Sequence, residues 1–169
     1  MILYGAIPEN KGEKMKVVIQ RVSEASVKVN GESIGKIGKG FLLLVGVGKD
    51  DTPDEAKIMA EKISKIRIFD DENGRMNLGI SNVNGSILSV SQFTLCGDCR
   101  RGNRPDYFDA ASPDQAKELY ELFNTELEEK GIAVEKGKFG ADMKVELVND
   151  GPVTIILDSN DLKKSRKEK

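Results

Sequence analysis

Residues 16–47, KVVIQRVSEASVKVNGESIGKIGKGFLLLVGV, decide the fold of this chain. Residues 16–22 and 25–30 are rich in β-branched side chains and predict strands. The Asn30-Gly31 pair predicts a tight turn into the next strand. Residues 40–47 form a continuous apolar run that is too short for most helices, so they predict a strand buried on both faces. The N-terminal third of the chain is therefore expected to form a sheet.

Two helix starts share one capping pattern. Thr52-Pro53-Asp54-Glu55 and Ser112-Pro113-Asp114-Gln115 each place a capping hydroxyl before a proline that suits the first turn. An apolar stripe with helical spacing follows each start. The stripes consist of Ala56, Met59, Ile63 and Ile66 in the first helix, and of Ala116, Leu119, Tyr120, Phe123 and Leu127 in the second. Gly131 is expected to end the second helix.

The rest of the chain predicts more strands, at residues 66–69, 86–95, 133–139, 143–148 and 153–157. DDENG and NDGP are predicted as turns between strands, and the charged segment 159–169 as a disordered tail. We find no internal repeat and no linker. The prediction is one α+β domain, with a curved, barrel-like antiparallel or mixed sheet and two main helices packed on it.

Composition restricts the number of domains, the class of protein and its location in the cell. The 169 residues suit one domain with a real core. No apolar run approaches the roughly 18 residues of a membrane-spanning helix. Residues 1–14 lack the basic start and apolar core of a secretory signal, and they precede a domain expected at 15–158. Two cysteines cannot form a disulfide framework, which favours a reducing, cytoplasmic location.

The chain contains no histidine. This excludes Ser-His-Asp and Cys-His catalysis and zinc sites built on imidazole. We expect neither a metal nor a cofactor. The net charge of −2 argues against non-specific coating of nucleic acid, but it allows a local basic patch to contact one RNA end.

Residues 89–105, SVSQFTLCGDCRRGNRP, contain two competing patterns. Cys96 and Cys99 form a Cys-x-x-Cys, but two further soft ligands for zinc are missing and no helix start follows, as a redox motif would need. On a strand, Ser89 and Ser91 would share a face with Phe93. Those hydroxyls indicate either a site or the ordinary polarity of an edge strand.

Three motifs resemble one known family. They are MKVVIQRV at 15–22, SQFTL at 91–95 and NDGPVT at 149–154. Together they look like the D-aminoacyl-tRNA deacylases of the bacterial and eukaryotic type, and the resemblance covers about residues 15–157. It implies an enzyme that hydrolyses the ester between a D-amino acid, or glycine, and the terminal adenosine of a tRNA, while it rejects L-aminoacyl substrates.

The resemblance also implies the site. The family is a homodimer with active sites at the subunit interface. One subunit supplies a catalytic wall, and the other supplies a Gly-cis-Pro element that selects the substrate's chirality. In this chain the wall corresponds to Ser91, Gln92, Phe93 and Thr94, the Gly-cis-Pro element to Gly151 and Pro152, its supporting arginine to Arg21, and the pocket near the adenosine to Phe139 and Met143.

Several alternatives stay open at this point. Thr94 could attack the ester, orient a water molecule or only shape the pocket, and a 2′-hydroxyl of the substrate could assist instead. Backbone N–H groups near Phe93 and Thr94 could stabilise the oxyanion. A rival function is a non-enzymatic module that binds an RNA end through Arg100, Arg101 and Arg104. A redox protein that uses the two cysteines is a third hypothesis.

Overall fold

A mixed six-stranded sheet forms the centre of the protein, for which a computed structural model describes residues 15–167. Its strands are β1 (Lys16–Val29), β2 (Glu32–Ile37), β3 (Gly40–Gly46), β6 (Ser86–Ser91), β7 (Ala133–Lys136) and β8 (Lys144–Asp158). The order is β2-β1-β3-β6-β7, and β8 pairs with β1. The β3–β6 and β6–β7 pairs are parallel and the others are antiparallel. The predicted mixed sheet is confirmed.

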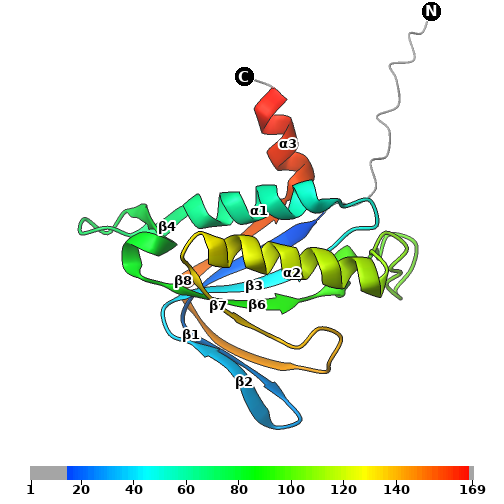
Figure 1. Cartoon of the computed structure of the whole chain (residues 1–169), viewed down its shortest axis with the longest axis horizontal. Helices are drawn as coiled ribbons and strands as arrows, with labels where there is room; N and C mark the ends of the chain where they lie inside the picture. Colours follow the sequence, from blue (N-terminus) through cyan, green and yellow to red (C-terminus); the bar gives the residue numbers. More distant parts are fainter. Residues whose placement is uncertain (1–14, 168–169) are drawn as a thin grey trace, which may run out of the picture.

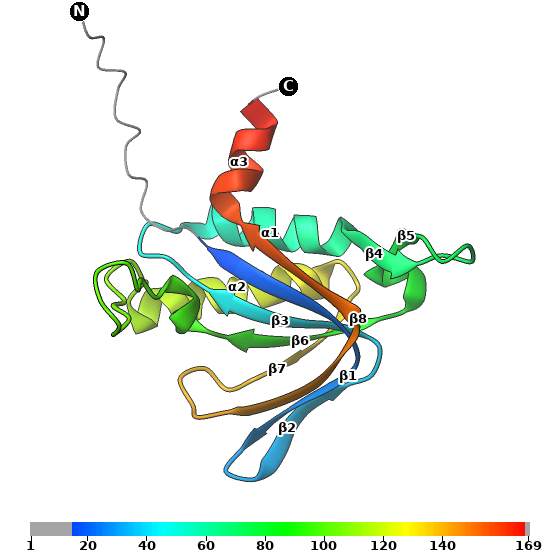
Figure 2. The same ribbon diagram turned by 180° about the vertical axis from the view of Figure 1, so that it is seen from behind.

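Strand β1 organises this sheet. Its first half pairs with β3 and its second half with β2, while β8 follows nearly its whole length on the other side. Figure 2 shows β1 and β8 curving together. The two strands predicted at 16–22 and 25–30 are therefore one. The Asn30-Gly31 turn has φ values of 51° and 82°, as its residue types predict.

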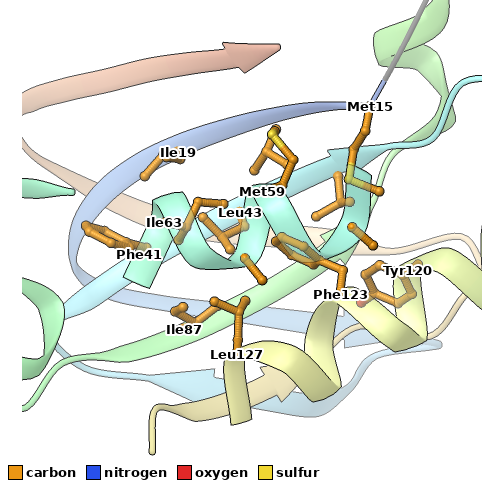
Figure 3. Close-up of a cluster of buried hydrophobic side chains, with 14 of the residues drawn as sticks. Met15, Ile19, Phe41, Leu43, Met59, Ile63, Ile87, Tyr120, Phe123 and Leu127 are labelled. Atoms are coloured by element: carbon orange, nitrogen blue, oxygen red, sulfur yellow. The ribbon is translucent and has the colours of Figure 1, made fainter. Parts of the chain in front are cut away.

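Helices α1 (Pro53–Lys65) and α2 (Pro113–Glu129) cover one face of the sheet (Figure 1). Both predicted starts are confirmed. The Glu55 carboxylate accepts hydrogen bonds from the Thr52 N–H and hydroxyl, at 2.7 and 2.6 Å, and Gln115 N–H donates to Ser112 Oγ. The predicted stripes face a core that includes Phe41 and Leu43 of β3 (Figure 3). Burial of such a side chain contributes about 1.5–3 kcal/mol.

A second apolar cluster lies on the other face of the sheet. It joins residues of β1, β2, β3 and β6, and the half-buried Met143, Val145 and Leu147 pack against it. The first part of β8 and the residue before it therefore curve over the face formed by β1, β2, β3 and β6. This is the predicted barrel-like curvature.

The prediction of a strand over 86–95 is wrong in its second half. Strand β6 stops at Ser91, and Phe93–Cys96 form a 3-10 turn, η2. Gln92 N–H still donates to Val45 C=O at 2.8 Å, but Leu95 N–H turns back to Gln92 C=O. Gly46 permits this turn, because a Cβ there would lie 2.9 Å from Leu95 Cβ. Phe93 therefore does not share a strand face with Ser89 and Ser91.

NDGP is not a hairpin turn, in contrast to the prediction. Residues 144–158 form the single strand β8, and its register against β1 shifts from Gln20–Thr154 to Val22–Asn149. Residues 150–153 consequently all lie opposite Arg21, as a large bulge. The Gly151-Pro152 bond within it is cis, and Gly151 has φ 132°.

Short elements complete the chain. Strands β4 (Arg67–Asp70) and β5 (Met76–Gly79) form a hairpin, which confirms the predicted DDENG turn, and a 3-10 turn, η1 (Ile80–Val83), leads to β6. Among residues 15–167, no helix combines the length and apolar character that a membrane crossing requires.

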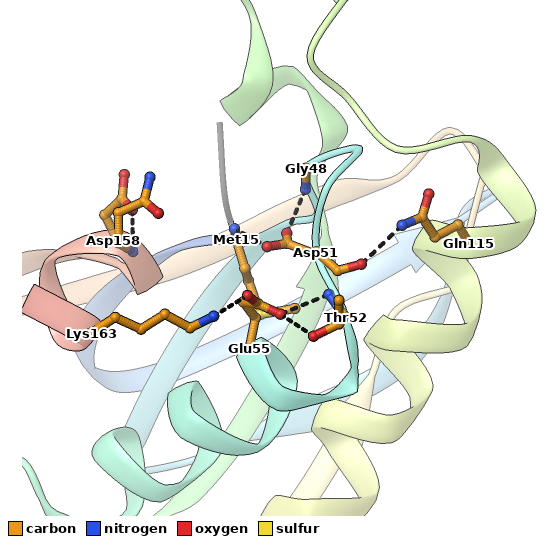
Figure 4. A network of polar contacts seen from close by, with 9 residues as sticks. Met15, Gly48, Asp51, Thr52, Glu55, Gln115, Asp158 and Lys163 are labelled. Carbon is orange, nitrogen blue, oxygen red and sulfur yellow. Dashed lines mark hydrogen bonds and ion pairs between the residues drawn. The ribbon is translucent and has the colours of Figure 1, made fainter. Parts of the chain in front are cut away.

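The chain from Ser159 to Lys167 is helix α3, where a disordered tail was predicted. Tertiary contacts to Met15 and Glu55 and one local hydrogen bond hold it in place. Ser159 N–H donates to Met15 C=O at 3.0 Å, Asn160 N–H donates to the Asp158 carboxylate at 2.8 Å, and Lys163 pairs with Glu55 (Figure 4). The extension predicted at 1–14 and the last two residues lie outside the described part.

Candidate active site

A pocket of about 600 Å³ opens where β6 ends. Its walls come from β3, β6, the chain around 107–116 and the segment between β7 and β8. Five of the predicted site residues line it: Ser91, Gln92, Phe93, Phe139 and Met143. Tyr107, Ala110, Ala116 and Asp142 are among its further lining residues. The structure therefore brings together segments that lie about 50 positions apart in the sequence.

Phe93 and Tyr107 line the pocket, and Thr94 follows Phe93 in η2. Phe93 is 56% exposed, and its ring meets that of Tyr107 edge to face with centroids 4.9 Å apart. Thr94 is exposed, and its hydroxyl accepts a hydrogen bond from the Gln92 side chain. Thr94 does not line the pocket, in contrast to its three predicted neighbours.

Tyr120 supports the floor of the pocket. Its hydroxyl donates to Ser89 C=O at 2.7 Å, and Gly137 N–H donates to the same oxygen at 2.9 Å. Its ring lies 6.1 Å from that of Phe139. Burial raises the pKa of Tyr120, so this phenol stays neutral near pH 7 and is a support, not a base. The sequence predicted Tyr120 only as a core residue.

Glycine at 137 determines where Met143 lies. A Cβ at Gly137 would come within 2.7 Å of Met143 Sδ, so the thioether packs directly on backbone. Met143 lies beside the pocket because this close approach is available. The flexible Met side chain suits such an irregular wall.

Arg21 fixes the bulge in β8. It is only 7% exposed, and its Nε donates to Asp150 C=O at 3.0 Å. Its Nη1 donates to Ile68 C=O at 2.8 Å and forms an ion pair with Asp70 at 3.4 Å. One guanidinium thus joins the bulge to β4, as its fork of donors allows.

Asn149 closes the same bulge from within β8. Its Oδ1 accepts the Val153 N–H at 3.0 Å, and its Nδ2 donates to Thr154 Oγ1 at 2.9 Å. At Gly151, a Cβ would lie 2.8 Å from Val153 Cγ2 and 3.1 Å from Arg21 Nη2. The bulge is therefore tightly braced and needs glycine there. Asn149 belongs to the NDGPVT motif, but the sequence pattern alone does not indicate this role.

The predicted residues form two separate groups in one chain. In the described part, neither Gly151 nor Pro152 lines the pocket, and both are exposed. Arg21 belongs to the bulge with them. The walls formed by Tyr107 and Ala116 were missed, because sequence spacing does not reveal which loop meets the end of a strand.

Cys96 ends η2, and Cys99 and the arginines follow it. Cys96 is buried with its Sγ 3.5 Å from Val47 C=O, and Cys99 is exposed. Hydrogen bonds from Arg100 lower the pKa of Asp98. Within residues 15–167, no three acidic or cysteine side chains gather as a metal site would require. Arg101 and Arg104 are exposed.

Comparison with known proteins gives consistent matches. A family model described as D-Tyr-tRNA(Tyr) deacylase matches residues 18–158. The chain is 57% identical over 155 residues to a D-aminoacyl-tRNA deacylase of Dictyoglomus turgidum, covering 92% of this chain and 99% of the relative. It is also 57% identical over 148 residues to one of Thermotoga petrophila, covering 88% and 99%.

Two solved structures are similar as well. One, described as c-Myc DNA unwinding element binding protein, has a TM-score of 0.79 and 42% identity, and the match covers 85% of this chain and 97% of that one. The other, described as a probable eukaryotic D-amino acid tRNA deacylase, has a TM-score of 0.75 at 17% identity, covering 85% and 98%. The second likeness concerns the fold alone.

Proposed function

The chain belongs to the D-Tyr-tRNA(Tyr) deacylase family, and from this premise we propose that its pocket binds the end of a D-aminoacyl-tRNA and that the ester is hydrolysed there. The chain is a hydrolase of D-aminoacyl-tRNA, as its relatives are named. One observation supports this location of the active site. Residues of the SQFTL motif, Phe139 and Met143 line one pocket of about 600 Å³, large enough for a nucleoside.

The pocket suits hydrolysis without a protein nucleophile. An aminoacyl ester is already activated, and the chain has no histidine. Phe93 and Thr94 begin η2, so their backbone N–H groups have no acceptor within that turn and can stabilise the developing oxyanion. Water attacks the ester carbonyl to form this oxyanion, the neighbouring 2′-hydroxyl of the substrate assists the proton transfer, and the ribose oxygen leaves as a hydroxyl, which releases the free D-amino acid and the tRNA. The exposed Thr94 hydroxyl shapes the rim.

The bulge at Gly151 and Pro152 acts as the chiral filter in this proposal. Arg21 and Asn149 brace it, so the carbonyl groups of the exposed Gly151 and Pro152 are held on a rigid backbone. They accept hydrogen bonds from the α-ammonium group of the substrate, which fixes the direction of the side chain. A D side chain then points away from the turn, whereas an L side chain collides with it. Glycine passes such a filter because it has no side chain.

A second copy of the chain completes the site. One apolar sheet face carries Val18, Leu44 and Ile156 as direct neighbours on three strands, and Ile156 is 70% exposed. The register puts these residues on the face opposite the helices. A partner covering this face would bring its bulge to the pocket of the first subunit. We therefore propose a homodimer, acting in the cytoplasm where aminoacyl-tRNA is used.

Incubation with D- and L-aminoacyl-tRNA tests the function. We expect release of the free D-amino acid at a rate well above spontaneous hydrolysis, with the L-ester left intact. Equal hydrolysis of both esters would contradict the filter. Binding without turnover would favour the RNA-end module, in which Arg101 and Arg104 remain exposed while Arg100 pairs with Asp98. Sedimentation of the active protein measures its mass and therefore whether it is a dimer.

A further inference from the structure

Phe108 is the most exposed large apolar side chain among residues 15–167, at 79%. Its neighbours Tyr107 and Ala110 line the pocket, so Phe108 lies at the rim. A phenylalanine that contributes so little to the core leaves apolar area in water, which is unfavourable by itself. Phe93 and Tyr107, which line the pocket, are exposed as well, at 56% and 38%, and several exposed aromatic rings at one pocket indicate a binding surface.

The backbone around Phe108 is firmly attached to the sheet. Lys49 N–H donates to Asp109 C=O at 2.9 Å, and Ala111 N–H donates to Val47 C=O at 3.0 Å. The Gln115 amide of α2 donates to the Lys49 and Asp51 carbonyl groups, at 3.2 and 3.0 Å; Figure 4 shows the contact with Asp51. The ring therefore projects from a rigid base at the end of β3.

Lys49 covers one face of this ring. Its Nζ lies 4.0 Å from the centroid and 3.2 Å from Asp109 Oδ1. The ammonium packs on one face of the ring while the Asp109 carboxylate holds it in place. Because Phe108 remains 79% exposed with Lys49 in contact, the ring still has a face for a flat ligand.

We propose that Phe108, held by Lys49, is a stacking platform for the unpaired nucleotide next to the terminal adenosine of the tRNA. This inference rests on the proposed function, because the nucleotide reaches the rim only if the terminal adenosine occupies the pocket. An aromatic ring stacks on any unpaired base, whereas a base paired in a stem has no free face. The exposed Arg101 and Arg104 of the same loop complement the adjoining phosphates.

The test compares two substrates that differ only beyond the pocket. D-aminoacyl-tRNA reaches Phe108, and D-aminoacyl-adenosine does not. For Phe108→Ala, we expect the ratio of kcat/KM for the tRNA substrate to that for the adenosine substrate to fall about 5- to 50-fold, mainly through KM. Phe108→Trp keeps a stacking ring, so it should keep the ratio near that of the unchanged protein.

Met76→Ala is the matched control. Met76 is 54% exposed on β5, which Figure 2 shows at the other end of the molecule from the loop before α2. An unchanged ratio in folded Phe108→Ala protein would overturn the platform, and so would an equal loss on both substrates. If the unchanged protein cleaves neither D-ester, the proposed function itself fails, and the platform fails with it.

Discussion

Arg21 and Asp150 lie 129 positions apart in the sequence, yet the Nε of Arg21 donates a hydrogen bond to the Asp150 carbonyl at 3.0 Å. The same guanidinium reaches Ile68 C=O on β4. In the strand register, Arg21 lies opposite the residues that bulge out of β8. This buried side chain therefore braces Gly151 and Pro152 from the opposite strand, while Asn149 braces them from within β8.

Arg21→Lys should weaken both folding and catalysis. A lysine keeps the charge but cannot direct a planar fork of donors to Asp150 and Ile68 together. We expect the free energy of unfolding to fall by about 1–3 kcal/mol and kcat/KM for D-aminoacyl-tRNA to fall at least about 10-fold. Denaturant titration and deacylation kinetics measure these effects. Arg67→Lys is the control, since Arg67 is exposed and its guanidinium bonds the exposed Asn77.

Asn149→Ala should loosen the bulge from its other side. The change removes the acceptor of the Val153 N–H and the donor to Thr154. We expect D-ester turnover to drop several-fold and the preference for D- over L-esters to narrow. Asn149→Asp keeps an acceptor for Val153 and should lose less. If both variants keep the full preference, Asn149 does not position the filter.

Thr94→Ala should retain substantial turnover. The hydroxyl is exposed, bonds the Gln92 side chain and lies outside the pocket lining. Single-turnover assays should show no acyl-enzyme in either protein. Loss of all enzyme-dependent hydrolysis in a folded variant would instead make Thr94 the nucleophile. Thr125→Ala on the exposed side of α2 controls for the substitution.

The Glu55–Lys163 pair should make the free energy of unfolding depend on pH in the acidic range. Burial of Glu55 alone would raise its pKa, but hydrogen bonds from Lys163 and Thr52 outweigh burial and lower the pKa to about 2 from 4.5. Because the folded protein favours the ionised form, this stabilisation is present above pH 4.5 and is lost as the pH falls toward 2. It amounts to at most about 3 kcal/mol.

Lys163→Met tests this assignment. We expect the free energy of unfolding to drop by about 1–2 kcal/mol at pH 6, with a smaller difference from the unchanged protein at pH 3. Lys164→Met removes an exposed neighbouring charge and serves as the control. A difference that is the same at both pH values would show that the ion pair is not its origin.

Changing both cysteines to serine should leave deacylation intact. Cys99 is exposed and lies outside the pocket, and Cys96 is a buried packing residue whose replacement can still bond Val47 C=O. We expect a loss of about 1–2 kcal/mol in unfolding free energy from the buried site alone. Thiol labelling of the native protein should modify Cys99 and spare Cys96. A large loss of activity in a well-folded double variant would contradict this interpretation.

The sequence by itself determined the local structure. The Asn30-Gly31 turn, the caps at Thr52 and Ser112 and the apolar stripes follow from backbone preferences and periodicity within a few residues. These features are confirmed because no distant contact opposes them. The three motifs that indicated the family are likewise short and readable in the chain.

Tertiary structure decided the rest. The strand from Ser86 stops at Ser91 because Gly46 of β3 allows η2 to pack there, and NDGP is a bulge because β1 pairs with both sides of it. Helix α3 forms on anchors supplied by Met15 and Glu55. In each case the outcome depends on a partner far away in sequence, whose packing and hydrogen bonds outweigh the local preference for a strand, a turn or disorder.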